Sequence, residues 1–278
     1  MNDQVEQIKA NIFEAIDSDQ IVLPTLPEVA LQVRTAAADD NVNVKSLAGV
    51  ISNDAALSVR VIKVANSPLL RASEPIEDLY TAVGRLGITY TANFATGLAM
   101  RQMFLATSPI VEQRMRDIWS KSTEVAGISH VLASQYSKIK PDQATLAGLV
   151  HKIGALPILT YAEGDAALLE DGDALDAIIE QAHPAIGCKI LQAWDFPEEL
   201  RIVPEEHIEY QRQRDVPDLT DIVMVANLQS YIGTDHPSIE MDWSRISAFS
   251  RLGIDCEIDS LQAEDLTEEM EAAAALLQ

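Results

Sequence analysis

The chain has 278 residues, of which 47% are hydrophobic but only 5% aromatic, so its core must consist mainly of Ala, Leu, Ile and Val side chains. Its 43 acidic and 20 basic residues give a formal net charge of −23, and the basic residues are scattered, with their densest cluster at 212–214. Because such a surface repels a phosphate backbone, the composition argues against direct nucleic-acid binding.

The cysteines and the hydropathy pattern bear on the compartment. Cys188 and Cys256 form no Cys-x-x-Cys pair and no disulfide framework, which is typical of a reducing compartment. The N-terminal segment is charged throughout, and no run approaches the roughly 18–20 apolar residues of a membrane span. We therefore expect a cytoplasmic protein with no membrane partner.

Helical periodicity dominates the first hundred residues. The side chains of Asn43 and Asp54 can accept backbone hydrogen bonds, and each precedes an apolar stripe, so both are predicted as N-caps. Pro68 ends the second stripe, and Gly87 is predicted to end a third helix as a left-handed C-cap. The predicted helices span about 43–52, Asp54 to Pro68, 76–86 and 88–105.

A break at Ser108-Pro109 divides the chain into two predicted helical lobes, 1–108 and 109–278. Alternation of period two is hard to find anywhere, so the predicted fold is all-α. The acidic stretch 163–176 is interpreted as a solvated loop and a helix N-terminus, because it lacks the regular ligand spacing of an EF-hand. The longer helices are predicted at 111–138, 142–161, 166–181, 184–194, 197–211 and 218–233, with a last one in the acidic tail after Asp255.

Several stretches together resemble the HDOD family, a non-enzymatic relative of the HD metal phosphohydrolases. They are LPTLPEVALQV at 23–33, LAGVISNDAALSVRVIKVANSPLL at 47–70, EPIEDLYTAVGRLGI at 74–88, LAGLVHKIGAL at 146–156 and HPAIGCKILQAWDFPEEL at 183–200. The resemblance covers about residues 20–232. It implies a phosphodiesterase-like (HD-domain) helical bundle with an N-terminal helical lobe, and a role in bacterial signal transduction.

An active HD site, as the resemblance implies, holds its metal with an early histidine, an adjacent His-Asp pair and a distant aspartate. The corresponding positions here are Lys121, His151-Lys152 and Asn227, so three of the four metal positions are changed and two of them to lysine. At ~4 Å and an effective dielectric of about 20, one such fixed positive charge costs a cation roughly 4 kcal/mol. The sequence therefore predicts no metal, no cofactor and no catalytic residue.

Two further histidines, His183 and His207, match histidine positions of the family, although Glu206 replaces the first member of a His-His pair. If the family fold holds, they converge with the changed positions in a remnant pocket formed by Lys121, His151, Lys152, His183, His207 and Asn227. Two lysines and two or more histidines could bind a phosphate or carboxylate there. The alternative is that each lysine pairs with a nearby acid of this acid-rich chain.

The individual histidines and Cys188 also have plain structural interpretations. His151 is expected to be a hydrogen-bonded core residue, and His183, which precedes Pro184, to cap a helix or pack. His207 is expected to be exposed. His130 and His236 belong to no constellation, and Cys188 lies in an amphipathic stripe as a core cysteine.

We therefore expect a non-catalytic regulatory protein that acts through protein–protein contact. Its acidic surface favours a basic protein partner, and its last helix is either a contact or homodimer element or packs on its own domain. One alternative is a metal-dependent phosphohydrolase acting on a nucleotide or phosphoester, with a displaced site of His151, His183, His207 and an acid such as Asp221 or Glu206. Another is an anion-sensing module that uses the remnant pocket.

Overall fold

The computed structural model describes residues 2–18, 20–67, 70, 74–106, 108–256 and 264–277, and within these ranges the chain is helical with no β-strand. The all-α prediction is confirmed. The predicted N-caps are also confirmed, because Asn43 Oδ1 accepts from the Ser46 amide at 3.0 Å and Asp54 Oδ1 accepts from the Leu57 amide at 2.9 Å. Pro68, predicted to end the second helix, lies outside the described residues.

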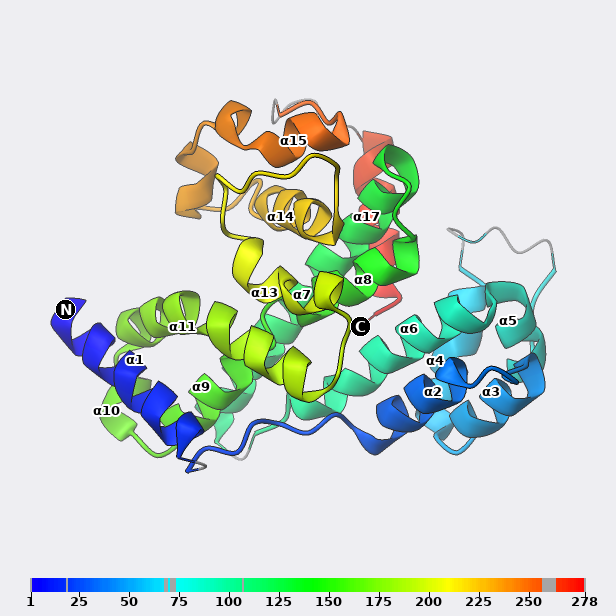
Figure 1. Cartoon of the computed structure of the whole chain (residues 1–278), viewed down its shortest axis with the longest axis horizontal. Coiled ribbons are helices and arrows are strands. Elements are labelled where there is room, and N and C mark those ends of the chain that lie inside the picture. Colours follow the sequence, from blue (N-terminus) through cyan, green and yellow to red (C-terminus); the bar gives the residue numbers. More distant parts are fainter. Residues whose placement is uncertain are drawn as a thin grey trace.

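The chain forms a series of α-helices with short 3₁₀ segments between some of them (Figure 1). The first half contains α1 (Asn2–Asp17), α2 (Glu28–Ala38), α3 (Val44–Ile51), α4 (Ala55–Ala65), α5 (Leu79–Leu86), α6 (Ile88–Ala99) and the 3₁₀ segment η2 (Met100–Met103). The part of the chain after residue 108 contains α7 (Pro109–Tyr136), α8 (Pro141–Val150), α9 (Ala155–Ala162), α10 (Ala166–Glu170), α11 (Gly172–Ala193), α12 (Glu198–Arg201), α13 (Val203–Glu206), α14 (Leu219–Gln229), η3 (Pro237–Glu240), η4 (Trp243–Arg245), α15 (Ser247–Leu252) and α17 (Glu264–Ala275).

Several predicted boundaries were wrong. The helix predicted from 76 begins at Leu79, where the Asp78 side chain caps it, and Gly87 combines a φ of 83° with an extended ψ of 161° instead of forming a left-handed helical cap. The predicted helix 142–161 is interrupted at 151–154, and 197–211 contains only two short helices.

The predicted helices 166–181 and 184–194 are divided differently in the structure, because α10 ends at Glu170 and α11 then continues without a break through Pro184 to Ala193. The side chain of Asp171 caps its start by accepting from the Ala174 amide at 3.0 Å, and Asp165 caps α10 in the same way. The acidic stretch therefore supplies helix N-termini, as predicted.

The long helix α7 is the central helix of the part after residue 108, where it packs against α8, α14 and α17 (Figure 1). Helices α2 to α5 gather at one end of the molecule, and α6 joins them to α8. Helix α1 lies apart from that group and packs on α11, where Lys189 Nζ is 2.6 Å from Asp17 Oδ1. The lobe boundary at residue 108 stays a prediction.

The C-terminal helix α17 packs on α7 of the same chain. A Cβ atom added to Gly127 would lie 2.5 Å from the backbone nitrogen of Ala274, so the two helix backbones are in contact there. This contact buries Ala273, Ala274 and Leu277. Packing on its own domain was one of the two predicted roles for this helix.

One stretch, Pro141–Ala162, is long and apolar enough to cross a membrane by length and composition alone. In the folded chain, 89% of its most apolar window is buried inside the protein. Burial of this kind is expected for a core helix, and this stretch supplies the α8–α9 junction on which the candidate site is built.

Candidate functional site

The candidate site begins at the junction between α8 and α9. His151 is completely buried, and its Nδ1 lies 2.6 Å from the carbonyl oxygen of Gly148. Because a carbonyl can only accept, Nδ1 carries the proton and donates it, which leaves Nε2 as a lone-pair acceptor. His151 is thus the hydrogen-bonded core histidine that the sequence predicted.

Two more histidines complete a buried cluster. The rings of His151 and His207 are 5.1 Å apart between centroids, and those of His183 and His207 are 5.6 Å apart. His207 also directs Nδ1 at backbone carbonyls, those of Val203 and Pro204, each at 3.0 Å. The cluster therefore joins the α8–α9 junction, α11 and the end of α13.

His183 was expected to cap a helix or to pack, and it packs, since its side chain is completely buried. The expectation that His207 is exposed was wrong. His183 lies inside α11 and caps no helix, because the capping residue of α11 is Asp171. His207 is fully buried although it follows two glutamates, since it closes a short helix that faces α11. Among the described residues, Nε2 of His151 and His207 and both ring nitrogens of His183 have no hydrogen-bond partner.

Lys152 brings a positive charge to this cluster. Its Nζ lies 2.5 Å from Oε1 of Glu180, and it also hydrogen-bonds the Tyr231 side chain. Burial lowers the pKa of Lys152, but Glu180 and Tyr231 outweigh it, so the pKa is raised and the amine stays charged.

Lys121 occupies the second changed position, on α7. Its ammonium group donates to the carbonyl of Ser230 and lies 3.1 Å from Oε2 of Glu124. It also lies 4.4 Å from the centroid of the Tyr231 ring, within the range of a cation–π contact. Each lysine therefore pairs with an acid, as one of the two predicted alternatives required.

Tyr231 links the two lysines, since Lys121 meets its ring and Lys152 its side-chain hydroxyl. His236 stacks on the same ring with 3.6 Å between centroids. Asn227 of α14 is 3% exposed, and its Oδ1 has no partner among the described residues.

Burial holds the clustered histidines neutral. It is the largest cause lowering the pKa of His207 to about 4, and the charge of Lys152 lowers it further. The pKa values of His151 and His183 are lowered well below their usual range by burial, then by His207 and Lys152. The three imidazoles are therefore neutral, and the positive charge beside them is the ammonium group of Lys152.

The donor set does not fit a divalent metal ion. Unpartnered imidazole nitrogens are suitable ligands, but within the described ranges no three His, Cys, Asp or Glu side chains form a group that could hold a metal ion. The charged amine of Lys152 acts on all three histidines and would repel a cation placed among them.

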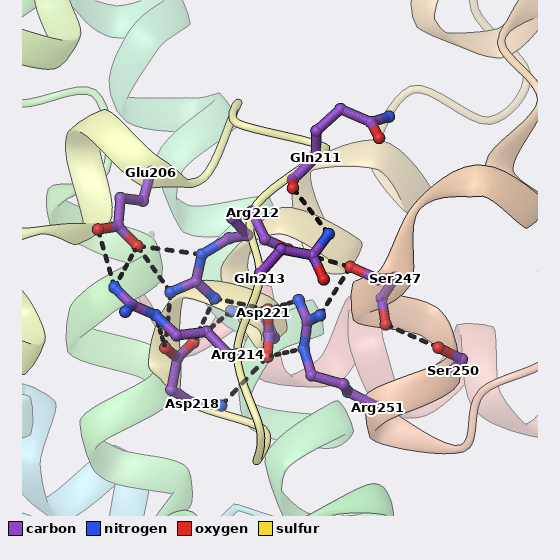
Figure 2. A network of polar contacts seen from close by, with 10 residues as sticks. All are labelled: Glu206, Gln211, Arg212, Gln213, Arg214, Asp218, Asp221, Ser247, Ser250 and Arg251. Carbon is purple, nitrogen blue, oxygen red and sulfur yellow. Dashed lines mark hydrogen bonds and ion pairs between the residues drawn. The ribbon is translucent and has the colours of Figure 1, made fainter.

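Acids proposed for a displaced metal site are bound to arginines instead (Figure 2). Asp221 is completely buried and accepts from Arg212 and Arg251, each at 2.6 Å. Glu206 accepts from Arg212 at 2.7 Å and from Arg214 at 3.0 Å. Arg212 and Arg214 of the basic cluster 212–214 thus form ion pairs within the protein, and those of Arg212 hold the loop after His207 against α14.

Two other predicted residues lie in separate surroundings. His130 is buried, with its Nδ1 3.0 Å from Thr145 Oγ1 and its ring against Tyr90 and Phe94. Cys188 is half-buried instead of belonging to the core, and its Sγ lies 3.7 Å from Oε2 of Glu205. Burial and the neighbouring carboxylate raise the pKa of that thiol to about 12, so it is a poor nucleophile.

Sequence reasoning missed Glu180 and Tyr231. Glu180 was detectable, because it lies three residues before His183 and therefore on the same face of a helix that continues through Pro184. The prediction of a helix break at Pro184 hid this relation. Tyr231 lies two residues after the end of α14 at Gln229, although the predicted helix 218–233 included it. Helical periodicity therefore indicated the wrong direction for its side chain.

These features define an all-α protein with the HD-domain-like fold and a lysine-containing histidine cluster at its centre. A family model for the HDOD domain matches residues 23–210. The chain belongs to the HDOD domain family.

Solved structures support the fold. A putative metal-dependent phosphohydrolase from Shewanella amazonensis SB2B matches with a TM-score of 0.88 and 30% identity over 99% of both chains. An HDOD domain protein of unknown function from Geobacter sulfurreducens shares the fold at a TM-score of 0.64 and 22% identity over 97% of each chain. A putative signal transduction protein from Marinobacter aquaeolei VT8 matches with a TM-score of 0.63 and 20% identity, over 93% of this chain and 60% of the Marinobacter chain.

An uncharacterized protein from Treponema pallidum (strain Nichols) is 25% identical over 209 residues. The match covers 70% of this chain but only 38% of the Treponema protein. The chain therefore spans well under half the length of that relative.

Proposed function

We propose that this chain is a non-catalytic regulatory protein that acts by binding a partner protein. The observation that carries the proposal is the ion pair between Lys152 and Glu180 beside three buried neutral histidines. In this arrangement the lysine amine supplies the positive charge of the pocket. A tethered ammonium group cannot coordinate a water molecule and lower its pKa as a divalent metal ion does.

The charge of the surface supports a basic partner. The net charge of −23 attracts a positively charged protein and repels anionic polymers. The naming of the Marinobacter relative as a signal transduction protein is consistent with a regulatory role.

The competing function is metal-dependent hydrolysis of a phosphoester, which is the activity named for the Shewanella relative. Metal analysis of the purified protein, followed by phosphodiesterase assays with added Mn²⁺ or Mg²⁺, separates the two. We expect less than stoichiometric metal and no turnover. Tightly bound metal at one or two equivalents together with hydrolysis would refute the non-catalytic proposal.

A second candidate function is the sensing of a small anion at the remnant pocket, Lys121, His151, Lys152, His183, His207 and Asn227. The observation that favours it is His183, which is completely buried and has no partner at either ring nitrogen among the described residues, because one of these nitrogens carries a proton that an anion could accept. Phosphate or a nucleotide should then raise the melting temperature of the native chain but not of a Lys152→Met variant. Equal shifts, or none in either protein, would rule this function out.

A further inference from the structure

A pocket of about 590 Å³ lies where elements from before and after residue 108 meet, away from the histidine cluster. Arg34 of α2 and Asn93 of α6 form part of its lining. The rest comes from the turn between α7 and α8, the start of α12 and the start of α14. Its volume falls within the range of sites that hold small molecules, and such sites often lie between separate parts of a fold.

Three cationic side chains line this pocket, in a chain with 43 acidic and only 20 basic residues. They are Arg34, Lys138 and Lys140. The two lysines are exposed, and neither side chain forms an ion pair or a hydrogen bond with any residue that the structure describes. Lys121 and Lys152, by contrast, each pair with an acid. The chain itself therefore leaves the positive charge of this pocket uncompensated.

The backbone holds the two lysines in place at the α7–α8 turn. Ser137 follows α7, and its Oγ accepts from the Ile139 amide at 3.1 Å, while Pro141 begins α8. Only Ile139 separates the two lysines, and it lines the same pocket. A turn that is fixed at both ends presents two ammonium groups to one pocket without the entropy cost of ordering a loop.

Arg34 is held by several contacts. Its guanidinium group lies over the Phe196 ring, 3.8 Å from the centroid, and donates to the carbonyl oxygens of Trp194 at 2.7 Å and Asp195 at 2.9 Å. Burial is the largest cause lowering the pKa of Arg34, and the charge of Asp195 does not offset it. The guanidinium charge thus lacks full compensation within the protein, and a bound anion would supply it.

Two acids also line the pocket, but one of them is already neutralised. Both oxygens of Asp218 accept from Arg212, at 2.8 and 2.7 Å. Glu199 is exposed, and Asp142 lies behind the lining, where Asn93 Nδ2 donates to it at 2.6 Å. The lining itself therefore has three cations against one unpaired carboxylate. An anion is attracted there, although the chain as a whole repels anions.

The remaining lining is largely apolar. Leu146 of α8, Leu200 of α12 and Leu219 of α14 contribute aliphatic groups, and Phe196 contributes its ring. Inorganic phosphate would leave these groups in contact with water, whereas an anion with an apolar group would cover them. The lining therefore suits a molecule with one charged end and one apolar end.

We infer that the pocket between α2, α6, the α7–α8 turn and α12 binds a small organic anion. Its carboxylate or phosphate group pairs with the three cations, and its apolar group covers the leucine side chains. No residue of the remnant pocket lines this site, so the two are separate. The inference goes beyond the proposed function and does not depend on it. Because α2 and α6 lie on one side of residue 108 in the sequence and α8 and α12 on the other, the ligand would hold these parts together.

The probes are phenyl phosphate and benzoate, which share an aromatic group and differ in the anion. Inorganic phosphate is the control for charge alone, and benzyl alcohol is the control for the apolar group alone. Titration into the ¹⁵N-labelled full chain should give saturable shifts at backbone amides within 138–146 and 198–200 with one or both probes. We expect each control to bind at least about tenfold more weakly than the better probe. The better probe identifies the anion as a phosphate or a carboxylate.

Variants separate the pocket from general surface charge. The double variant Lys138→Met, Lys140→Met should weaken binding at least about tenfold. Lys63→Met is the matched control, because Lys63 is also exposed and has no ion pair among the described residues but lies outside the pocket lining. This control variant should bind as the native chain does.

Gln143→Glu tests the charge of the pocket without weakening the fold. Gln143 lines the pocket as the third residue of α8, where a glutamate stabilises the start of a helix. The added carboxylate should abolish binding of the better probe, while the melting temperature stays unchanged or rises. Full binding by this variant would contradict the assignment.

Lys152→Met distinguishes this pocket from the remnant pocket, and we expect it to leave binding unchanged. Loss of binding in Lys152→Met, equal weakening by Lys63→Met and the double variant, equal binding of inorganic phosphate and the better probe, or no saturable shift with either probe would each overturn the assignment. These outcomes are independent of the metal and phosphodiesterase measurements. Failure of this site therefore leaves the proposed function standing, and failure of the proposed function leaves this site standing.

Discussion

Lys152 and Glu180 form an ion pair in which the two partners differ in exposure. The lysine side chain is 10% exposed and the glutamate side chain 49%, with 2.5 Å between Nζ and Oε1. Water can therefore replace the lysine as a partner of Glu180, but it reaches Lys152 much less easily. The two halves of this pair should not be equally important for stability.

The first prediction concerns that asymmetry. Lys152→Met should change the free energy of unfolding by no more than about 1 kcal/mol, because the remaining carboxylate becomes hydrated. Glu180→Gln should cost about 2 kcal/mol, less than for a fully buried pair, because it leaves a buried ammonium group with Tyr231 as its remaining side-chain partner. Urea unfolding at pH 7 measures both.

The pair between Lys189 and Asp17 is the control, because its side chains are 42% and 67% exposed. Removing either of those partners should change stability by less than about 1 kcal/mol, equally for both. If Lys152→Met proved more costly than Glu180→Gln, the charge of Lys152 would itself be the stabilising feature of the site.

The second prediction concerns pH. Burial lowers the pKa values of His130 and His207 to about 4, below the ordinary 6.5 that applies to the unfolded chain. Below pH 6.5 the unfolded chain therefore binds more protons than the folded one, and the free energy of unfolding falls as the pH decreases toward 4. As the pH falls from 6.5 to 4, each of these histidines should lower the free energy of unfolding by up to about 3 kcal/mol.

His151 and His183 act in the same direction, because burial lowers their pKa values as well. Urea unfolding between pH 7.5 and 4.5 should therefore show a steep loss of stability on the acid side. A His207→Gln variant should reduce the slope of the free energy of unfolding against pH by roughly 1.4 kcal/mol per pH unit, which is the value for one proton. A flat profile would mean that the cluster is hydrated and titrates normally.

Local sequence signals predicted much of the fold, since a cap or a stripe is decided by residues a few positions apart. Asn43 and Asp54 are examples, because each bonds an amide three residues later. The partners in the candidate site are remote in sequence, as with Lys121 and the Ser230 carbonyl, which lie 109 residues apart. Family resemblance indicated His151, His183 and His207, whose rings pack together, but only packing could select Glu180, Glu124 and Tyr231 as partners of the two lysines.

His207 shows why burial was misjudged. It ends a four-residue helix with two acidic residues, too short a segment for periodicity to reveal a buried face. Its burial arises from contact between α13 and α11, which no local pattern contains.

The third prediction concerns the arginine network of Figure 2. Asp221 is fully buried and pairs with Arg212 and Arg251, which are 5% and 10% exposed. Asp221→Ala should lower the free energy of unfolding by about 3–5 kcal/mol, because it leaves two buried guanidinium groups short of a partner. Arg214→Ala, with a side chain 44% exposed, should cost less than about 1 kcal/mol. Similar costs for both variants would show that the network is hydrated in solution.

The last prediction concerns Gly154, where α9 begins against α11. A Cβ atom at this position would lie 2.0 Å from the carbonyl oxygen of His183 and 2.5 Å from the amide nitrogen of Gly187. Both atoms are backbone, so Gly154→Ala must push the two helices apart, and we expect a loss of at least about 2 kcal/mol in the free energy of unfolding.

Gly49→Ala is the matched control, because a Cβ atom there meets nothing within 4 Å and the position is an exposed helix interior. The Gly49→Ala variant should gain about 0.5–1 kcal/mol in the free energy of unfolding.

The Gly154 variant has a second readout. Because the contact at Gly154 holds α11 against the α8–α9 junction, Gly154→Ala should also admit water and raise the pKa of His183 toward 6.5. A stable Gly154→Ala protein with an unchanged histidine titration would show that the junction does not depend on this close approach.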